Sequence, residues 1–289
     1  MMFSIQRMPL LAVLTVVLAT TVHAADRPLK TFILAGQSNM VGYGDSTELP
    51  DELRKGNDRA LMFEGGKWQP LRPHKPPGQD QRRLGLTEFC FGPEIAFGHE
   101  MAKASPDETI GIIKHAVGGS SLLAWKPDWS KAQADRVGQA GRGPLYKKMM
   151  NKLKQAQEER DIEIVGFLWL QGGGDMKKLD VAKEYLDNLK AFVAAIRRDT
   201  GVADLPFLYG SPRPKGAPAD LADLVPELME GIRPGAQWVV KAQFDAQKAI
   251  PHSKMVILRD IEKHPRNVHF NTAGQLAVGK LFAEAFLER

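Results

Sequence analysis

One short apolar segment, followed at once by a glycine and a serine, constrains the fold of this chain more than any other feature. The segment 31–35 has the length and composition of a buried strand, and it ends at Gly36, two residues before Ser38. Glycine permits a tight turn because it has no side chain. Parallel-sheet folds use such a turn to present a serine hydroxyl at the carboxyl edge of the sheet. Ser38 is therefore a candidate nucleophile, the alternative being a strand that ends in an ordinary polar turn.

Further strand-like segments alternate with helical patterns along the chain. A short one is expected at 60–63, and longer ones begin near residues 109, 162, 206 and 255. Between them, apolar residues recur at helical spacing, as in 143–160 and 177–200. A further helical region is expected at 221–249, with interruptions near Pro226 and at Pro234-Gly235. Alternating strands and helices indicate a parallel sheet covered on both faces. The sequence therefore predicts an α/β fold, a flavodoxin-like three-layer α/β/α sandwich with about five strands.

The first 24 residues have the pattern of a secretory signal peptide. Arg7 makes the start positive, an apolar stretch runs from Leu10 to Ala19, and small residues precede a cleavage site after Ala24. The alternative is a membrane anchor, but the stretch is shorter than the roughly 20 residues that a spanning helix needs. We expect cleavage after Ala24, export to the periplasm or the exterior, and no membrane span in the mature protein.

The remaining residues, 25–289, are expected to form a single domain, since no repeat or low-complexity linker divides them. The chain carries a formal charge of +5, with basic and acidic residues interleaved, which indicates solubility rather than a nucleic-acid partner. The single cysteine, Cys90, excludes an intramolecular disulfide and has the apolar neighbours of a buried thiol. We expect no metal or other cofactor, because neither ligand spacing nor a nucleotide fingerprint is present.

Three more motifs stand where predicted elements end or begin. Gly118 and Gly119 follow the second long strand, Gln171 follows the third, and His269 precedes a closing helix at 272–287 with Thr272 as its expected N-cap. Backbone without side chains can approach a reacting carbonyl and direct an N–H at its oxygen. Because ligands of such folds bind at the carboxyl ends of the strands, we expect these motifs to gather near Ser38.

The string Gly-Gln-Ser-Asn-Met around Ser38, followed in order by Gly118-Gly119, Gln171 and His269, resembles the SGNH-hydrolase superfamily. More narrowly, it is similar to the sialate O-acetylesterase and acetylxylan esterase branch. The resemblance implies a serine esterase that removes acetyl groups from sugars, with Ser38 as nucleophile and His269 as base. It also implies an oxyanion hole formed by the backbone of Ser38 and of Gly118 or Gly119, with the Gln171 side chain. The choice among sialic acid, xylan and other acetylated polymers stays open.

Two positions depart from the pattern of this family, which usually carries an acid at one or both of them. One follows Gln-Gly in the third motif, where this chain has Gly173, and the other stands three residues before the histidine, where it has Arg266. Loss of the triad acid costs serine hydrolases on the order of 10⁴-fold in turnover. An arginine close to His269 would also lower its basicity.

Several alternatives follow from the missing acids. Asp175 is one candidate replacement, and Asp260 or Glu262 before the histidine loop is another. A Ser–His pair without an acid is the third alternative. The fourth is a catalytically impaired relative that binds acetylated glycans in the same cleft.

Three other side chains have two interpretations each. Trp125 and Trp129 follow the Gly118 motif, and they suit either sugar stacking or core filling. Glu94, in Gly-Pro-Glu at the start of a helix, matches a sequence common in the family, but it also suits a charge that offsets the helix dipole.

Overall fold

The centre of the molecule is a seven-stranded sheet in the order β4-β3-β6-β1-β7-β8-β9. A computed structural model describes residues 27–212 and 234–289. Neighbouring strands are parallel except for the hairpin of β3 and β4. The strands are β1 (Leu29–Gly36), β3 (Ala60–Glu64), β4 (Lys67–Pro70), β6 (Ile110–Ala116), β7 (Ile162–Leu170), β8 (Phe207–Pro212) and β9 (Ser253–Leu258). A separate pair is formed by β2 (Gly44–Asp45) and β5 (Cys90–Phe91).

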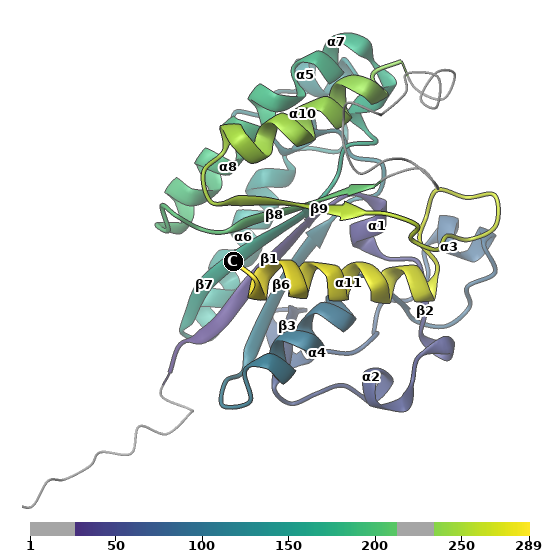
Figure 1. The fold of residues 1–289 in the computed structure, drawn as a ribbon, viewed down its shortest axis with the longest axis vertical. Helices are drawn as coiled ribbons and strands as arrows, with labels where there is room; N and C mark the ends of the chain where they lie inside the picture. The colour runs from purple at the N-terminus through teal and green to yellow at the C-terminus, as the bar shows by residue number, and fades with distance from the viewer. Residues whose placement is uncertain (1–26, 213–233) are drawn as a thin grey trace, which may run out of the picture.

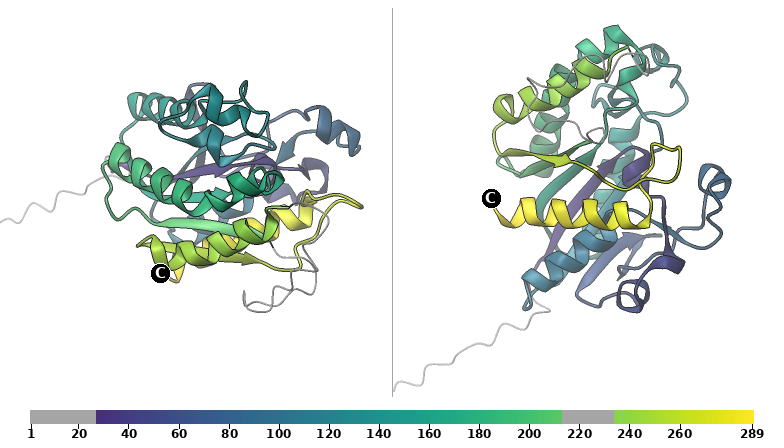
Figure 2. Two further views of the ribbon diagram at one scale, coloured as in Figure 1. Left: turned by 90° about the horizontal axis from the view of Figure 1, so that it is seen from above. Right: turned by 45° about the vertical axis from the view of Figure 1, so that its right-hand side comes forward.

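Helices cover both faces of this sheet (Figure 1). On one face α4 (Glu94–Ala104) packs against α11 (Thr272–Leu287), and on the other lie α6 (Leu145–Glu159), α8 (Tyr185–Thr200) and α10 (Ala236–Ala249). The right-hand view of Figure 2 shows the strands between these two helical layers. The predicted three-layer α/β/α sandwich is therefore confirmed, with the expected short strand β3 and an unexpected antiparallel strand β4 added to the five long strands.

The shorter helices connect these elements. They are α1 (Ser38–Val41), α2 (Asp51–Lys55), α3 (Gln79–Arg83), α5 (Lys131–Asp135) and α7 (Leu179–Lys183), with 3₁₀ turns η2 (Ser46–Glu48), η3 (Leu122–Trp125) and η4 (Asp175–Lys177).

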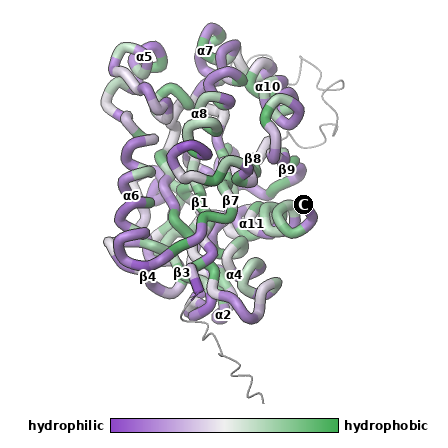
Figure 3. The backbone as a smooth tube through the Cα atoms, turned by 90° about the vertical axis from the view of Figure 1, so that its left-hand side faces the viewer, coloured by the Kyte–Doolittle hydropathy of each residue, from purple (hydrophilic) through white to green (hydrophobic). Residues whose placement is uncertain are grey.

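Both faces of the central strand β1 are covered along residues 32–35, which explains why this part of its sequence is apolar. Ile33 and Ala35 lie in the core cluster under α6 and α8, whereas Phe32 and Leu34 lie in the cluster under α4 and α11. All four are at most 1% exposed. A strand alternates its side chains between the two faces of the sheet, so a strand covered on both faces is apolar at every position. Hydrophobic segments gather along these central strands in Figure 3.

Two local predictions were wrong. The helix expected at 177–200 is divided at Glu184 into α7 and α8, and Lys177 belongs to the preceding turn η4. The N-cap of α11 is Asn271 and not Thr272: the Asn271 side chain accepts a hydrogen bond from the N–H of Gly274 at 2.9 Å. Thr272 is the first helical residue, and its hydroxyl oxygen accepts from the N–H of Asp45 instead, so it contributes a tertiary contact.

Two predictions concern residues that the structure does not describe, one wholly and the other in part. The expected signal peptide at 1–24 is not among them, and of the helical region expected at 221–249 only α10 is. Within the described ranges, no helix is long and apolar enough to cross a membrane.

The register of the sheet aligns the ends of its three middle strands. Gly36 pairs with Ala116 of β6 on one side and with Leu170 of β7 on the other. Residues that follow these three positions therefore share one edge of the sheet, as is general for the carboxyl ends of parallel strands. The motifs of Ser38, Gly118 and Gln171 all begin within two residues of that line.

Candidate active site

Ser38 lies on a turn that only glycine allows. Gly36 has a φ of +147°, and a Cβ there would stand 2.3 Å from the carbonyl oxygen of Leu170. The turn places Ser38 at the start of α1, where it is 8% exposed. Its hydroxyl makes no hydrogen bond to any other described residue, His269 included. Catalytic hydrogen bonds commonly close only when substrate is bound, so a free hydroxyl in this structure agrees with the expected role of Ser38.

Gly118 stands directly beside the serine. A Cβ built on Gly118 would lie 3.9 Å from the Cβ of Ser38. Among the described residues, the backbone N–H groups of Ser38, Gly118 and Gly119 have no hydrogen-bond acceptor. Free backbone N–H donors next to a serine can stabilise a negatively charged carbonyl oxygen.

Gln171 has a different task from the one expected. Its amide nitrogen donates to the Ser120 carbonyl at 2.9 Å and to Oδ2 of Asp175 at 2.5 Å. Its amide oxygen accepts from the Tyr185 hydroxyl at 2.9 Å. Both amide hydrogens are used, and the residue is 3% exposed. The Gln171 side chain is therefore not available as an oxyanion donor in this structure, contrary to the sequence-based expectation. Instead it joins the segment after Gly119 to the segment that contains Asp175.

Asp175 is engaged in the same network. Its carboxylate accepts from the Ser121 hydroxyl at 2.8 Å and from the N–H of Leu122 at 2.9 Å, in addition to Gln171. Complete burial raises the pKa of this carboxyl to about 6, although these donors act in the opposite direction. With its oxygens directed to these partners, Asp175 is not oriented towards His269.

A hydrogen-bond clamp ties the serine turn to the histidine loop. The Asn39 side chain donates to the Val268 carbonyl at 3.3 Å and accepts from the N–H of Phe270 at 3.0 Å. These two residues flank His269, so the residue after Ser38 fixes the backbone on both sides of the histidine. The Asn267 side chain adds a hydrogen bond from the N–H of His269 at 3.0 Å. The structure therefore brings the predicted nucleophile and the predicted base into one neighbourhood.

The imidazole of His269 is held by an aromatic ring. Tyr43 stacks on it with the ring centroids 3.8 Å apart and the planes 4° from parallel. The Nδ1 atom is buried and has no hydrogen-bond partner among the described residues. Burial lowers the pKa of His269; the Asp80 carboxylate opposes this effect and His264 adds to it. A neutral imidazole, which can accept a proton, is favoured.

The remaining positions around the histidine do not supply an acid. Asp260 and Arg266 are both exposed and both have left-handed backbone, with φ of 52° and 53°. No hydrogen bond within the described parts of the chain joins Asp260 to His269. Glu262, the other candidate, accepts a hydrogen bond from Asn271 at 3.3 Å. The unpartnered Nδ1 of His269 is consistent with the absence of an acid at positions 173 and 266.

Burial decides the interpretation of several other side chains. Trp125 is completely buried in the core and donates to the Ser120 hydroxyl at 3.0 Å, so it is a core residue and not a sugar platform. Trp129 is half-buried against Gly143. Cys90 is buried as expected, and burial raises the pKa of its thiol to about 11. No group of three or more potential metal ligands occurs in the part of the chain that the structure describes.

Sequence reasoning missed Tyr43 and the part played by Gln37. The Gln37 side-chain oxygen accepts from the N–H groups of Gly172 and Gly174, at 3.4 Å and 3.1 Å. The apolar character of Tyr43 and its place five residues after Ser38 are visible in the sequence, but a stacking partner 226 positions later in the chain is not.

Comparisons with known proteins show the family to which this chain belongs. A family model described as carbohydrate esterase, sialic acid-specific acetylesterase, matches residues 28–288. A probable carbohydrate esterase of Arabidopsis thaliana is 24% identical over 280 residues, which cover 90% of this chain and 91% of that protein.

Solved structures share the fold. An Arabidopsis thaliana structure has a TM-score of 0.66 at 22% identity and covers 91% of this chain and 99% of its own. NanS has a TM-score of 0.62 at 16% identity, with 90% and 97% covered. A carbohydrate acetylesterase from Xanthomonas citri has a TM-score of 0.60 at 20% identity, with 89% of this chain and 55% of its own covered.

Proposed function

The chain belongs to the carbohydrate esterase family of sialic acid-specific acetylesterases, and we propose that it is an exported serine esterase that removes O-acetyl groups from carbohydrates. The observation that carries the proposal is the clamp of Asn39 around His269, next to Ser38 on the turn after β1. Through it, the hydroxyl and the imidazole that ester hydrolysis requires share one edge of the sheet.

The proposed reaction has two halves. The Ser38 hydroxyl oxygen attacks the acetyl carbonyl carbon, its proton passes to His269, and the carbonyl oxygen becomes negatively charged. The N–H groups of Ser38 and of Gly118 or Gly119 stabilise that oxygen. The sugar oxygen then leaves with the proton from His269. Water, deprotonated by His269, attacks acetyl-Ser38 and releases acetate.

The centre works without a triad acid in this proposal. The stack on Tyr43 and the bonds to the adjacent backbone orient His269 in the absence of a carboxylate at its Nδ1. Orientation by packing does not stabilise the imidazolium that forms during the reaction, whereas an acid would do so. We therefore expect turnover below that of an otherwise equal centre with the acid.

A second candidate function rests on the missing acid near His269. The unpartnered Nδ1 of His269 and the exposed Arg266 also favour a catalytically impaired relative that binds acetylated glycans. The two functions differ in a single property, the Ser38-dependent release of acetate.

Export rests on the first 24 residues, which lie outside the described ranges. We expect the mature protein to begin at Ala25, with residues 25–289 as one domain. An intact-mass measurement on protein recovered from the periplasm or the medium tests both export and the cleavage position.

The test of the esterase is acetate release from an aryl acetate and from acetylated xylan and O-acetylated sialosides. Turnover should vanish in Ser38→Ala and in His269→Ala. His252→Asn is the matched control. His252 is exposed and has a left-handed backbone conformation, which asparagine tolerates. Equal inactivity of the parent and of both variants on all substrates would reject the esterase in favour of the binding protein.

A further inference from the structure

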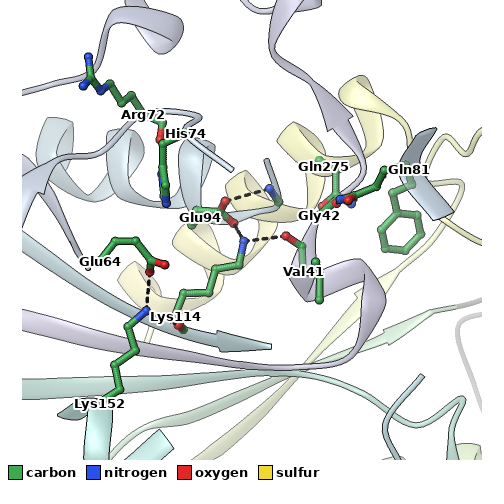
Figure 4. Close-up of polar contacts among 12 residues, drawn as sticks. Val41, Gly42, Glu64, Arg72, His74, Gln81, Glu94, Lys114, Lys152 and Gln275 are labelled. Atoms are coloured by element: carbon green, nitrogen blue, oxygen red, sulfur yellow. Dashed lines mark hydrogen bonds and ion pairs between the residues drawn. The ribbon is translucent and has the colours of Figure 1, made fainter. Parts of the chain in front are cut away.

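A buried ion pair lies beneath the serine turn and is not used by the proposed reaction. The ammonium of Lys114 on β6 stands 2.6 Å from Oε2 of Glu94 at the start of α4, and the two side chains are 9% and 6% exposed. The other carboxylate oxygen of Glu94 accepts from the N–H of Gly92 at 2.9 Å. Figure 4 shows this pair beside Val41, with the Lys114 nitrogen joined to both the Glu94 carboxylate and the Val41 carbonyl oxygen.

The lysine also contacts the helix that begins with Ser38. Its ammonium donates to the Val41 carbonyl at 2.9 Å, and Val41 is the last residue of α1. The carboxyl end of a helix carries partial negative charge on free carbonyls, which a cation stabilises. Ser38 stands at the amino end of this one-turn helix, and Lys114 fixes its carboxyl end.

The glutamate side of the pair is packed just as closely. A Cβ on Gly92 would lie 2.7 Å from Oε2 of Glu94 and 2.8 Å from the Met40 carbonyl oxygen. At Gly42 a Cβ would stand 2.2 Å from the Phe91 backbone. The segment 91–92, which Glu94 holds, therefore lies directly against α1. The ion pair thus contacts α1 itself through Lys114 and the segment packed against α1 through Glu94.

The burial of this pair has a cost that surface pairs do not have. Removing two charges from water costs several kcal/mol per ion, and an apolar pair of similar volume is often at least as stable. Burial lowers the pKa of Lys114, and the Glu94 carboxylate opposes that effect. Stability alone therefore does not explain why the ion pair is buried here, whereas its contacts with the serine turn do.

We infer that the Glu94–Lys114 ion pair is a positioning device for the nucleophile: it holds α1 so that the Ser38 hydroxyl faces the acyl carbon, without touching substrate. The inference rests on the proposed esterase function and adds to it a specific residue pair. A dipole-offsetting charge at Glu94, the other interpretation of the Gly-Pro-Glu motif, would not require Lys114 or its contact with Val41.

The test removes both charges together, in Glu94→Gln/Lys114→Met. The glutamine keeps an acceptor for Gly92, and no uncompensated charge stays buried, so the double variant should fold even where single variants fail. The control is Lys30→Met/Glu108→Gln, which removes a pair with a 2.5 Å contact at the opposite, amino end of β1.

Two measurements are made on the double variant, the control and the parent. With an aryl acetate, kcat should fall between about 10- and 100-fold in the double variant with KM nearly unchanged, since small misplacement of a reacting group has effects of this size. Independently of activity, the amides of residues 40–42, whose hydrogen bonds to Gln37 and Ser38 close α1, should exchange with deuterium at least about tenfold faster.

The outcomes separate the two proposals. Unchanged exchange at 40–42, or an unchanged kcat, in a folded double variant would overturn the positioning role. Inactivity of the parent on every ester would instead reject the esterase, and the exchange measurement would still decide whether the pair holds the turn. The control should match the parent in both readouts.

Discussion

His269 stands where the resemblance places the catalytic base, and its Nδ1 has no hydrogen-bond partner among the residues that the structure describes. In the triad of serine hydrolases an acid accepts a hydrogen bond from this nitrogen, fixes the tautomer and stabilises the imidazolium. In this chain the ring is fixed by the stack on Tyr43 and by the bonds to its backbone. At the scale of single residues, packing orients the imidazole, while no carboxylate of the described residues bonds to its Nδ1.

The first prediction concerns the pH dependence of activity. Only neutral His269 can take the serine proton, and burial lowers its pKa below the usual 6.5. The rise of kcat/KM with pH should therefore have its midpoint below about 6.5, because this limb reports the base in the free enzyme. A pH–rate profile on an aryl acetate measures it, and a midpoint above 7 would contradict this environment of His269.

The second prediction restores a carboxylate. Arg266→Asp places an acid at the position three residues before the histidine that the resemblance identifies. It should raise kcat at least about tenfold and move the midpoint of the acidic limb to higher pH, since a nearby anion favours the imidazolium. Arg266→Asn is the control for loss of the arginine alone. Equal rates in the aspartate and asparagine variants would show that position 266 does not reach the ring.

The third prediction concerns stability. Asp175 has a pKa raised to about 6 by burial, so between pH 4 and pH 6 the folded state holds a proton that the unfolded state has released. This carboxyl therefore makes the protein less stable as pH rises through that range, by on the order of 3 kcal/mol. The pH dependence of the unfolding free energy, compared between the parent and Asp175→Asn, isolates this contribution. A parent and variant with parallel curves from pH 4 to pH 6 would contradict it.

At the scale of elements, the site depends on loops that are joined by hydrogen bonds between distant parts of the sequence. Asn39 follows Ser38 on α1, and its partners stand beside His269 more than 200 residues later. Gln37 holds the loop after β7 in the same manner. The short elements at the sheet edge are therefore positioned by neighbours, not by their own helical propensity.

The fourth prediction tests the clamp. Asn39→Ala removes both hydrogen bonds to the histidine loop and should lower kcat by about 10- to 100-fold, because His269 is no longer held near Ser38. The control Asn57→Ala removes a side chain that bonds only locally, to the N–H of Arg59. Steady-state kinetics with thermal denaturation separates catalysis from unfolding. A folded Asn39→Ala variant with the kcat of the parent would contradict the clamp.

At the scale of the whole molecule, the sheet was predictable because its signals are local. Each central strand is an apolar run that ends near a glycine or glutamine motif, so both the sandwich and the shared edge follow from the sequence. The antiparallel strand β4 was missed because Lys67–Pro70 is largely exposed and has no apolar pattern. The division of the region 177–200 was missed because its apolar spacing continues across Glu184, where α7 ends and α8 begins.

The details of the site were less predictable, since they depend on contacts between distant segments. No local pattern distinguishes Gln171 as a donor to substrate from Gln171 as a donor to Asp175. The same holds for the stack of Tyr43 on His269 and for the contact of Lys114 with Val41. Residue types and strand ends identify which segments meet, whereas three-dimensional packing decides which side chain each hydrogen bond joins.

The central claim is that Ser38 is a nucleophile activated by His269, and covalent labelling tests it most directly. The mature protein is treated with a fluorophosphonate, which phosphonylates activated serines, and the label is located by peptide mass spectrometry. The account predicts one label, on Ser38, absent in Ser38→Ala and formed at least about 100-fold more slowly in His269→Ala. A label on another serine, or equal labelling of the parent and His269→Ala, would contradict it.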